Sequence, residues 1–204
     1  MTQPIEFMVV VEDVLTGSVA KRLVDRCGSR AKIHDPVVVM NGFGNIKKNI
    51  QRCINASHIF PHIVITDLDS YKCPAALRRD WRADNLPDTV LFSVAIREVE
   101  SWLLADSRAI SRYLQVPENK IPPAPEEAQD PKQVLINLAR RSRSRIIREE
   151  IPSQDDSKSQ QGVLYNQHMT AFVNAEWEIE RAMERSPSLK RIALRLEQFI
   201  ENRS

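Results

Sequence analysis

Short apolar runs alternate with longer amphipathic stretches through the first half of this chain. Four runs have the length and the β-branched content of strands: 7–11, 37–40, 63–66 and 90–96. An uninterrupted apolar run of this kind is typical of a strand buried on both faces of a sheet. The segments between the runs carry apolar residues at helical spacing. This alternation predicts an α/β fold, Rossmann-like, with a mostly parallel four-stranded sheet flanked by helices.

Helix signals lie in each of the connecting segments. Thr16 is a suitable N-cap for a helix in which Val19 and Leu23 share an apolar face. The turn 41–45 leads into a second amphipathic helix, and Pro74 is placed to begin a third. The first half is therefore expected to form strand–helix–strand units.

The second half of the chain differs in composition. Segment 117–131 contains five prolines, which predicts an irregular surface loop, and helical spacing resumes at 132–143. Segment 152–162 is polar and is expected to be flexible, and 169–203 reads as two helices broken at Ser186 and Pro187. We expect a core at 1–116 and a helical extension of the same domain at 117–204, packed beside the sheet.

Composition narrows the class of protein. The 204 residues include 29 Lys and Arg against 27 Asp and Glu, so a uniformly basic nucleic-acid-binding surface is excluded while a local basic patch is not. No apolar run approaches the ~18 residues of a membrane span, and the first segment has no basic start of the signal-peptide kind. Cys27, Cys53 and Cys73 lie far apart, as expected of free thiols in a reducing cytoplasm.

Acidic residues follow three of the four expected strands. Functional groups collect at the carboxyl ends of parallel strands, so these side chains should meet at one edge. In an extended segment, Asp67 and Asp69 would face the same way because they are two residues apart. The acids of this edge are Glu12, Asp13, Asp67, Asp69, Glu98 and Glu100.

Crowded carboxylates repel one another, and protonation or a bound divalent cation relieves that repulsion. Oxygen ligands with no neighbouring His or Cys favour Mg²⁺ or Mn²⁺ over zinc, and such a cation supports phosphodiester cleavage. Any single acid here could instead cap a helix, as Asp106 is expected to do for 107–114. The sequence predicts that Glu12, Asp67 and Asp69 jointly form a metal site.

A glutamate after the first strand followed by an Asp-x-Asp pair resembles the Toprim domain. That domain is shared by topoisomerases, bacterial primases, small RNA-maturation nucleases and the overcoming-lysogenization-defect nucleases. Three longer stretches, at 95–106, 130–132 and 186–191, resemble a bacterial family of small Toprim-like proteins often encoded beside an ABC/AAA-type ATPase. Toprim domains usually have glycine after the first glutamate, whereas this chain has Asp13, which could enlarge the metal site or alter its chemistry.

The resemblance implies roles for individual positions. Glu12 would be the general acid/base or a metal ligand, and Asp67 and Asp69 would be Mg²⁺ ligands. Glu98 and Glu100 would support a second metal or the Arg97 side chain. Lys132 would contact the scissile phosphate. It also implies a partner ATPase and a role in phage defence.

Basic residues cluster C-terminal to Lys132. Such a cluster can neutralise nucleic-acid phosphates, although a solvated helix face would look the same. The candidates for phosphate contact are Arg97, Arg140, Arg141, Arg143 and Arg145, with Arg148 close by. Trp102 and Trp177, by contrast, have apolar neighbours at helical spacing and are expected in the core.

Together these features favour a Mg²⁺- or Mn²⁺-dependent nuclease acting on RNA or DNA in the cytoplasm, with no membrane partner. Two alternatives belong to other classes. A receiver-like signalling domain would also place acids after its first strand and a phospho-accepting aspartate at Asp67, but it would want Ser or Thr where Glu98 and Glu100 lie. A non-enzymatic regulatory subunit of the partner ATPase would use the acids only structurally.

Overall fold

The computed structural model describes residues 3–154 and 160–203. The chain forms two compact units. One, here called the sheet unit, contains the chain up to Ile96 together with the residues from Ser188 onward. The other, the helical unit, is Arg97–Pro187. The expected division at residue 116 differs from this one, because the last helix belongs with the sheet and the residues after Ile96 with the helices.

The sheet unit contains a parallel sheet of five strands, in the order β2-β1-β4-β5, with β3 also pairing with β1. The α/β class and the parallel sheet are thereby confirmed, with one strand more than expected. The additional strand is β2, which has only three residues and therefore no recognisable apolar run. The strands are β1 (Ile5–Val11), β2 (Ala31–Ile33), β3 (Val38–Val39), β4 (His62–Asp67) and β5 (Val90–Ala95).

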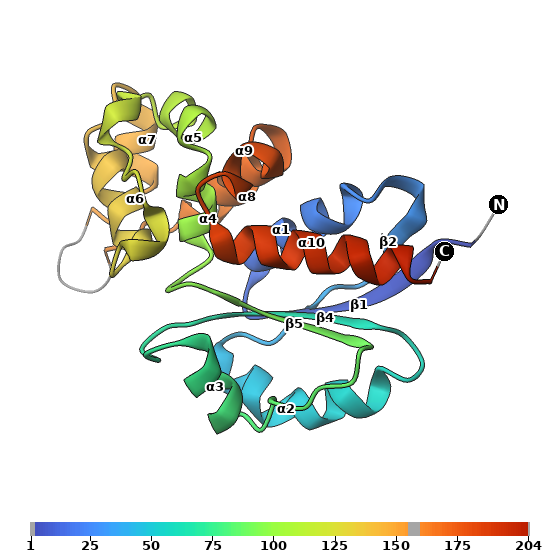
Figure 1. The fold of residues 1–204 in the computed structure, drawn as a ribbon. Helices are drawn as coiled ribbons and strands as arrows, with labels where there is room; N and C mark the ends of the chain where they lie inside the picture. The colour runs from blue at the N-terminus through green and yellow to red at the C-terminus, as the bar shows by residue number, and fades with distance from the viewer. Residues whose placement is uncertain (1–2, 155–159, 204) are drawn as a thin grey trace. The chain divides into compact units, whose positions relative to one another are not determined.

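Helices cover both faces of this sheet (Figure 1). On one face lie α1 and α10, and on the other lie α2 and α3. Helix α1 begins at Val14 and is capped by Asp13, whose Oδ1 accepts from the Thr16 N–H at 2.8 Å. The expectation that Thr16 is the cap was wrong, because the carboxylate three residues earlier reaches that N–H first. The helices are α1 (Val14–Asp25), α2 (Phe43–Ala56), α3 (Pro74–Asp80) and α10 (Pro187–Glu201), with a 3₁₀ turn at Gly28–Arg30.

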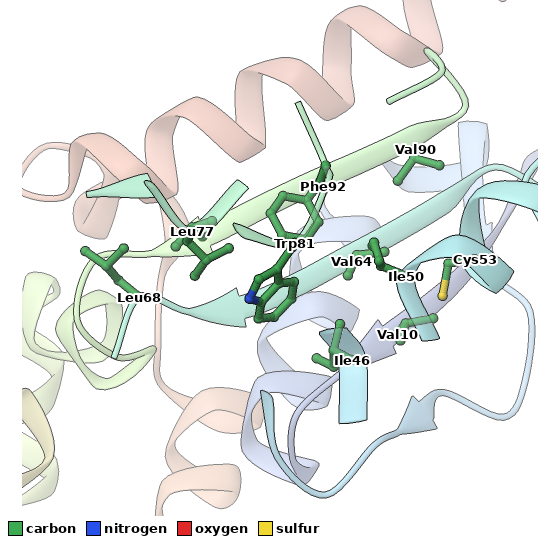
Figure 2. Close-up of a cluster of buried hydrophobic side chains, with 12 residues drawn as sticks. Val10, Ile46, Ile50, Cys53, Val64, Leu68, Leu77, Trp81, Val90 and Phe92 are labelled. Atoms are coloured by element: carbon green, nitrogen blue, oxygen red, sulfur yellow. The ribbon is translucent and has the colours of Figure 1, made fainter. Parts of the chain in front are cut away.

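The core between the sheet and the α2–α3 layer is built around two aromatic rings. Trp81 follows α3, and its ring meets that of Phe92 on β5 edge-on, with centroids 5.8 Å apart. Figure 2 shows Val64 of β4 and Ile46 and Ile50 of α2 in the same cluster. Each of these side chains is at most 5% exposed. This apolar layer holds β1, β4 and β5 in register, so the residues at their carboxyl ends have fixed positions.

The helical unit has its own buried residues. Trp102 and Trp177 are fully buried, and the Trp177 indole N–H donates to the Trp102 carbonyl at 3.1 Å. The expectation that both are core residues is confirmed. The helices are α4 (Glu100–Ala105), α5 (Ser107–Tyr113), α6 (Pro131–Arg140), α7 (Arg145–Glu150), α8 (Tyr165–Ala175) and α9 (Ile179–Met183), with 3₁₀ turns at Glu118–Lys120 and Pro125–Glu127.

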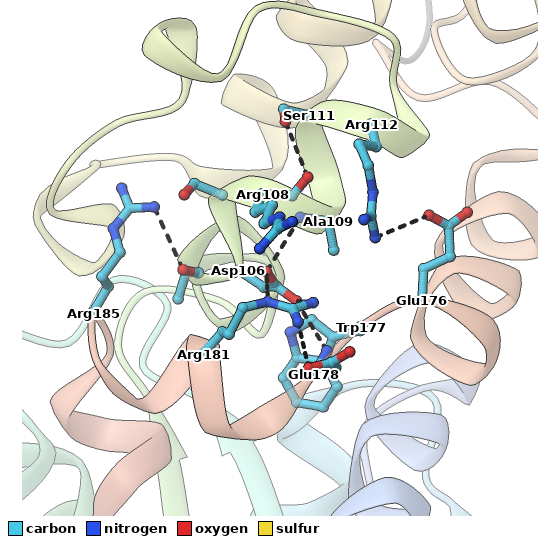
Figure 3. A network of polar contacts seen from close by, with 12 residues as sticks. Asp106, Arg108, Ala109, Ser111, Arg112, Glu176, Trp177, Glu178, Arg181 and Arg185 are labelled. Carbon is cyan, nitrogen blue, oxygen red and sulfur yellow. Dashed lines mark hydrogen bonds and ion pairs between the residues drawn. The ribbon is translucent and has the colours of Figure 1, made fainter.

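A buried carboxylate joins two of these helices (Figure 3). Asp106 caps α5, as expected, by accepting from the Ala109 N–H at 3.2 Å. It also accepts from the Glu178 N–H at 2.9 Å, where α9 begins. The Arg181 guanidinium bonds both Asp106 oxygens, at 2.9 and 2.8 Å. One side chain thus satisfies the otherwise unpaired backbone N–H groups at two helix starts.

Three further expectations have mixed outcomes. Segment 169–203 was expected to form two helices, but a break at Glu176–Glu178 divides α8 from α9 before α10 begins. The proline-rich segment is irregular as expected, yet Ile121 and Pro125 are buried. The middle of the polar segment 152–162 falls at 155–159, outside the described residues. No helix in the described parts of the chain is long and apolar enough to cross a membrane.

Candidate functional site

Strand order reverses at β1, which makes its carboxyl end the natural place for a ligand. β1 pairs with β2 and β3 on one side and with β4 on the other. The chain therefore crosses over β1 when it passes from β3 to β4. In open parallel sheets, ligands bind beyond the carboxyl ends of the strands at such a reversal point. Here that point is occupied by Glu12, directly after β1, and by Thr66 and Asp67, at the end of β4.

The Glu12 carboxylate bridges the ends of the two strands. Its Oε1 accepts from the Thr66 hydroxyl and from the Asp67 backbone N–H, the latter at 2.8 Å. Thr66 is fully buried, so its hydroxyl has no water to bond and is satisfied by donating to Glu12 within the protein. These two bonds leave Oε2 of Glu12 without a role in this bridge. The side chain is therefore both fixed in direction and half-buried at the reversal point.

Electrostatics at this position disfavour the ionised form of Glu12. Burial raises the pKa of its carboxyl, and the negative charges of Asp13 and Asp69 raise it further. The bonds from Thr66 and Asp67 lower that pKa but do not cancel the rise. A carboxylate in this state gains from a proton or a cation nearby. The crowding expected from the sequence is thus present around Glu12.

Asp13 and Asp69 are held by local backbone structure. Asp13 caps α1, which gives a structural role to the residue that was expected to enlarge the metal site or alter its chemistry. Asp69 is exposed and has φ 49°, so the segment after Asp67 is not extended. The Leu68 N–H still bonds the Ala95 carbonyl at 2.9 Å, after which the chain turns. The expectation that Asp67 and Asp69 face the same way assumed an extended segment, and the backbone at Asp69 does not have that conformation.

The turn expected at 41–45 also borders Glu12, a neighbour that the sequence did not predict. The Gly42 N–H donates to the Glu12 backbone carbonyl at 3.2 Å. Gly42 has φ 114° and Asn41 has φ 54°, conformations that glycine and asparagine adopt most readily. The Asn-Gly pair was a signal for this turn, and Thr66 at a strand end was a signal for the hydroxyl partner. Both were visible in the sequence, but only the pairing of β1 with β3 and β4 brings them to Glu12.

The remaining acids of the predicted metal site lie in the helical unit. Glu98 Oε2 accepts from the Lys132 backbone N–H at 2.9 Å, in the first turn of α6. Glu100 Oε1 accepts from the Tyr165 hydroxyl at 3.0 Å and lies 3.4 Å from the Lys132 ammonium. That ammonium also lies over the Tyr165 ring, 5.9 Å from its centroid. The structure thus brings Glu98, Glu100 and Lys132 together around Tyr165.

Glu100 is the most strongly perturbed acid of this group. Burial raises the pKa of its carboxyl to about 7, against the lowering effects of the Lys132 charge and the Tyr165 hydroxyl. It is only 2% exposed, so the ionised form loses nearly all of its hydration. A carboxyl with this pKa exchanges a proton at neutral pH. Its contact with Lys132 is a feature that the sequence alone did not predict.

The carboxylates of the sheet unit are the candidates for holding a divalent cation. Within the described residues, no group of three or more His, Cys, Asp or Glu side chains is preformed to hold a metal ion. Mg²⁺ usually keeps several waters and binds one or two carboxylates, so a cage of protein ligands is not required. The repulsion of Glu12 by neighbouring acids is the observation that fits a cation, and Glu12, Asp67 and Asp69 are the residues that would hold it.

The predicted nucleic-acid-binding arginines engage in local contacts in the helical unit. Arg145 pairs with Glu149 at 2.7 Å, and Arg140 bonds Asn137. Arg148 donates to the Ser142 carbonyl at 2.6 Å. Arg97 is half-buried with φ 63°, and Arg141 is the exposed C-cap residue that follows α6. Arg143 is exposed and lines a pocket of ≈410 Å³ with Arg112.

Comparisons with protein-family models, with curated proteins and with solved structures found no match for this chain. The Glu12 group lies at the strand reversal point, where parallel sheets bind ligands. The Glu100 group contains the carboxyl whose pKa is raised most. Both combine carboxylates with hydrogen-bond donors, as proton-transfer sites do.

Proposed function

We propose that this protein is a metal-dependent nuclease, hydrolysing phosphodiester bonds of RNA or DNA with Mg²⁺ or Mn²⁺. The observation that carries the proposal is the Glu12 carboxylate, fixed by Thr66 and Asp67 at the point where strand order reverses. A ligand at this point meets acids from two strands, and a phosphodiester there requires a cation to offset them. The order of elements, with Glu12 after β1 and an Asp-x-Asp pair that begins at the last residue of β4, supports the same reading.

Each residue of the group has a definite part in this proposal. Asp67 and Asp69 would hold the cation, which would supply Lewis-acid polarisation of phosphate oxygens. Glu12 exchanges a proton with the attacking or leaving oxygen, and a raised pKa suits a general acid/base that works near neutral pH. Thr66 keeps the Glu12 side chain in one orientation throughout.

The proposed biological setting is an ATPase-linked defence system. Its support is the resemblance of segments 95–106, 130–132 and 186–191 to Toprim-like proteins encoded beside ABC/AAA-type ATPases. In this setting the partner ATPase controls when the nuclease acts. The proposed substrate is nucleic acid whether or not the partner ATPase takes part.

A cleavage panel tests the proposed function. The substrates are tRNA, single-stranded RNA, and single- and double-stranded DNA, each with Mn²⁺, Mg²⁺ or EDTA, with and without the neighbouring ATPase. We compare wild type with Asp67→Asn and with Asp25→Asn, a control that removes the same charge from the exposed face of α1. We expect cation-dependent cutting by wild type and Asp25→Asn, and a loss of at least about 100-fold in Asp67→Asn. Equal cutting by all three would contradict the assignment.

A further inference from the structure

A second group of charged residues lies along the open edge of the sheet. Strand β5 is the last in the strand order, and α3 and α10 flank it on the two faces of the sheet (Figure 1). A cavity of ≈40 Å³ opens along this edge. Among the residues that line it are one serine of β5, one arginine of α3 and two arginines of α10: Ser93, Arg78, Arg191 and Arg195. All belong to the sheet unit.

The three arginines have no acidic partner within the described residues. Arg78 donates to the Ala83 carbonyl at 3.2 Å, and Arg195 donates to the Phe92 carbonyl at 3.0 Å. Burial lowers the pKa of Arg195, and the charges of Arg78 and Arg191 lower it further. Arg191 and Arg195 are also one helical turn apart, a spacing at which like charges destabilise a helix. Asp84 and Asp88 line a neighbouring pocket with Arg78 and Arg195, but no ion pair among the residues that the structure describes joins them to these arginines, and an anion bound among the three balances their charge directly.

The cavity and its lining define the anion. A volume of ≈40 Å³ admits one small group rather than a whole nucleotide base. Guanidinium groups present paired N–H donors that match the oxygens of a phosphate or carboxylate, and Ser93 adds a hydroxyl group. Three cations around one group exceed what a single carboxylate charge balances. A phosphate, with up to two negative charges and four oxygens, satisfies them better.

We propose that this cavity, the β5-edge site, binds a phosphate group. The phosphate belongs to a nucleic-acid backbone or to a free phosphate compound, and the chemistry of recognition is shared between them. The proposal stands apart from cation binding at Glu12, because different residues carry it.

A competing reading gives these arginines only a protective role. The carbonyls of Thr89 and Ala95 accept hydrogen bonds on the β4 side. Successive carbonyls of a strand point to opposite sides, so the Phe92 carbonyl points to the open edge, where Arg195 donates to it. Charged side chains on an edge strand prevent pairing with another chain. Protection of the edge explains Arg195, but it does not require the two further charges of Arg78 and Arg191.

Phosphate titration distinguishes the two readings. The variant is Arg191→Gln, because Arg191 makes no hydrogen bond or ion pair in the described parts of the chain and its loss leaves the fold intact. The control is Lys190→Gln, the exposed neighbour on α10 that removes the same charge outside the cavity. Binding of inorganic phosphate to the full chain is measured by calorimetry at low salt. We expect wild type and Lys190→Gln to bind alike, and Arg191→Gln about tenfold more weakly.

A ten-nucleotide oligothymidylate, titrated in the same way without divalent cations, identifies the source of the phosphate. If Arg191→Gln binds the oligonucleotide more weakly than wild type and Lys190→Gln does not, the site is supported with a nucleic-acid backbone as its ligand. Weaker phosphate binding with unchanged oligonucleotide binding supports the site with a free phosphate compound as its ligand. Equal phosphate binding by all three proteins, or none by wild type, would overturn the proposal and leave the protective role. Because no cation or cleavage is involved, neither result depends on the nuclease proposal.

Discussion

Two glutamates in this protein have raised pKa values for the same main reason, which is burial. Glu12 lies at the strand reversal point and keeps two hydrogen-bond donors, Thr66 and Asp67. Glu100 lies inside the helical unit with Tyr165 and Lys132. In each case burial disfavours the ionised carboxyl, and nearby hydrogen-bond donors or a positive charge offset part of that cost. Such arrangements are common where proton transfer occurs, although structural networks produce them as well.

The Glu100 carboxyl makes stability depend on pH in a specific window. Its pKa is about 7 in the folded chain, against 4.5 for an ordinary glutamate. Between these values the folded chain keeps a proton that the unfolded chain has lost, so the free energy of unfolding falls as pH rises and levels off above 7. The total change is on the order of 3 kcal/mol.

Urea unfolding at pH 5, 6, 7 and 8 measures this effect in wild type and in Glu100→Gln. We expect the wild-type free energy of unfolding to decline relative to that of the variant across the window. Buried His62, whose pKa is lowered, contributes equally to both proteins and cancels in the difference. Parallel profiles for the two proteins would show that Glu100 does not titrate there.

Residue roles could be predicted from the sequence where the partner lies nearby in the chain. Asp106 was correctly predicted as a cap because it bonds a backbone N–H three residues on. The Arg181 contact to the same carboxylate spans 75 positions, and the Tyr165 contact to Glu100 spans 65. Contacts at these separations depend on tertiary packing, which has no local pattern. Lys132 was therefore assigned to phosphate from the resemblance, while its contact with Glu100 in the fold was not foreseen.

At the scale of elements, the apolar runs were the most reliable signal. Each of the four expected strands is present, because a continuous β-branched run of this length has few other places to be buried. The missed strand Ala31–Ile33 is too short to show such a run. The missed break between α8 and α9 falls at Glu176–Glu178, where neither proline nor glycine marks it. Elements that depend on neighbours more than on their own pattern were the ones missed.

The two helix starts joined by Asp106 provide a test at this scale. Replacing Arg181 with alanine leaves a buried carboxylate without its cation, because Asp106 is 1% exposed. We expect a loss of about 3–5 kcal/mol in the free energy of unfolding. The matched control is Arg112→Ala, whose exposed contact with Glu176 is 4.0 Å long and should cost less than about 1 kcal/mol (Figure 3).

Chemical denaturation of the two variants beside wild type measures both values. A loss of similar size in Arg181→Ala and Arg112→Ala would contradict the account of the Asp106 network. A repeat at high salt adds a second check. Screening affects the exposed Arg112 pair more than the buried Asp106 pair, so only the Arg112 effect should shrink.

At the scale of the whole molecule, the sheet unit is discontinuous in the chain. Its residues up to Ile96 are completed by Ser188–Ser204, which carries most of α10. The ring centroids of Phe199 on α10 and Phe7 on β1 lie 5.4 Å apart. A division read along the sequence follows changes in composition, such as the proline-rich stretch at 117–131. Packing of the C-terminal helices beside the sheet was expected and holds for α10, but the division at residue 116 did not separate this helix from the helices that precede it.

The helical unit is continuous and should fold alone. Its fully buried aromatic residues, Trp102, Tyr165, Phe172 and Trp177, all lie within Arg97–Pro187. We expect a polypeptide of residues 97–187 to give near-ultraviolet circular dichroism and a cooperative unfolding transition. A chain ending at residue 187 should instead lose cooperative unfolding of the sheet unit, because β1 and β5 lose the cover of α10. A broad, non-cooperative transition of the 97–187 polypeptide would contradict its independence.

The central claim is that the acids at the ends of β1 and β4 form a divalent-cation site, and Mn²⁺ titration tests it most directly. Binding requires neither the right substrate nor an activating partner, so a silent enzyme still answers the question. Calorimetry of wild type, Asp67→Asn and the charge-matched Asp25→Asn at constant pH provides the comparison. The account predicts Mn²⁺ binding by wild type and Asp25→Asn, and binding at least about tenfold weaker by Asp67→Asn. Equal affinities in all three, or no Mn²⁺ binding by wild type, would contradict it.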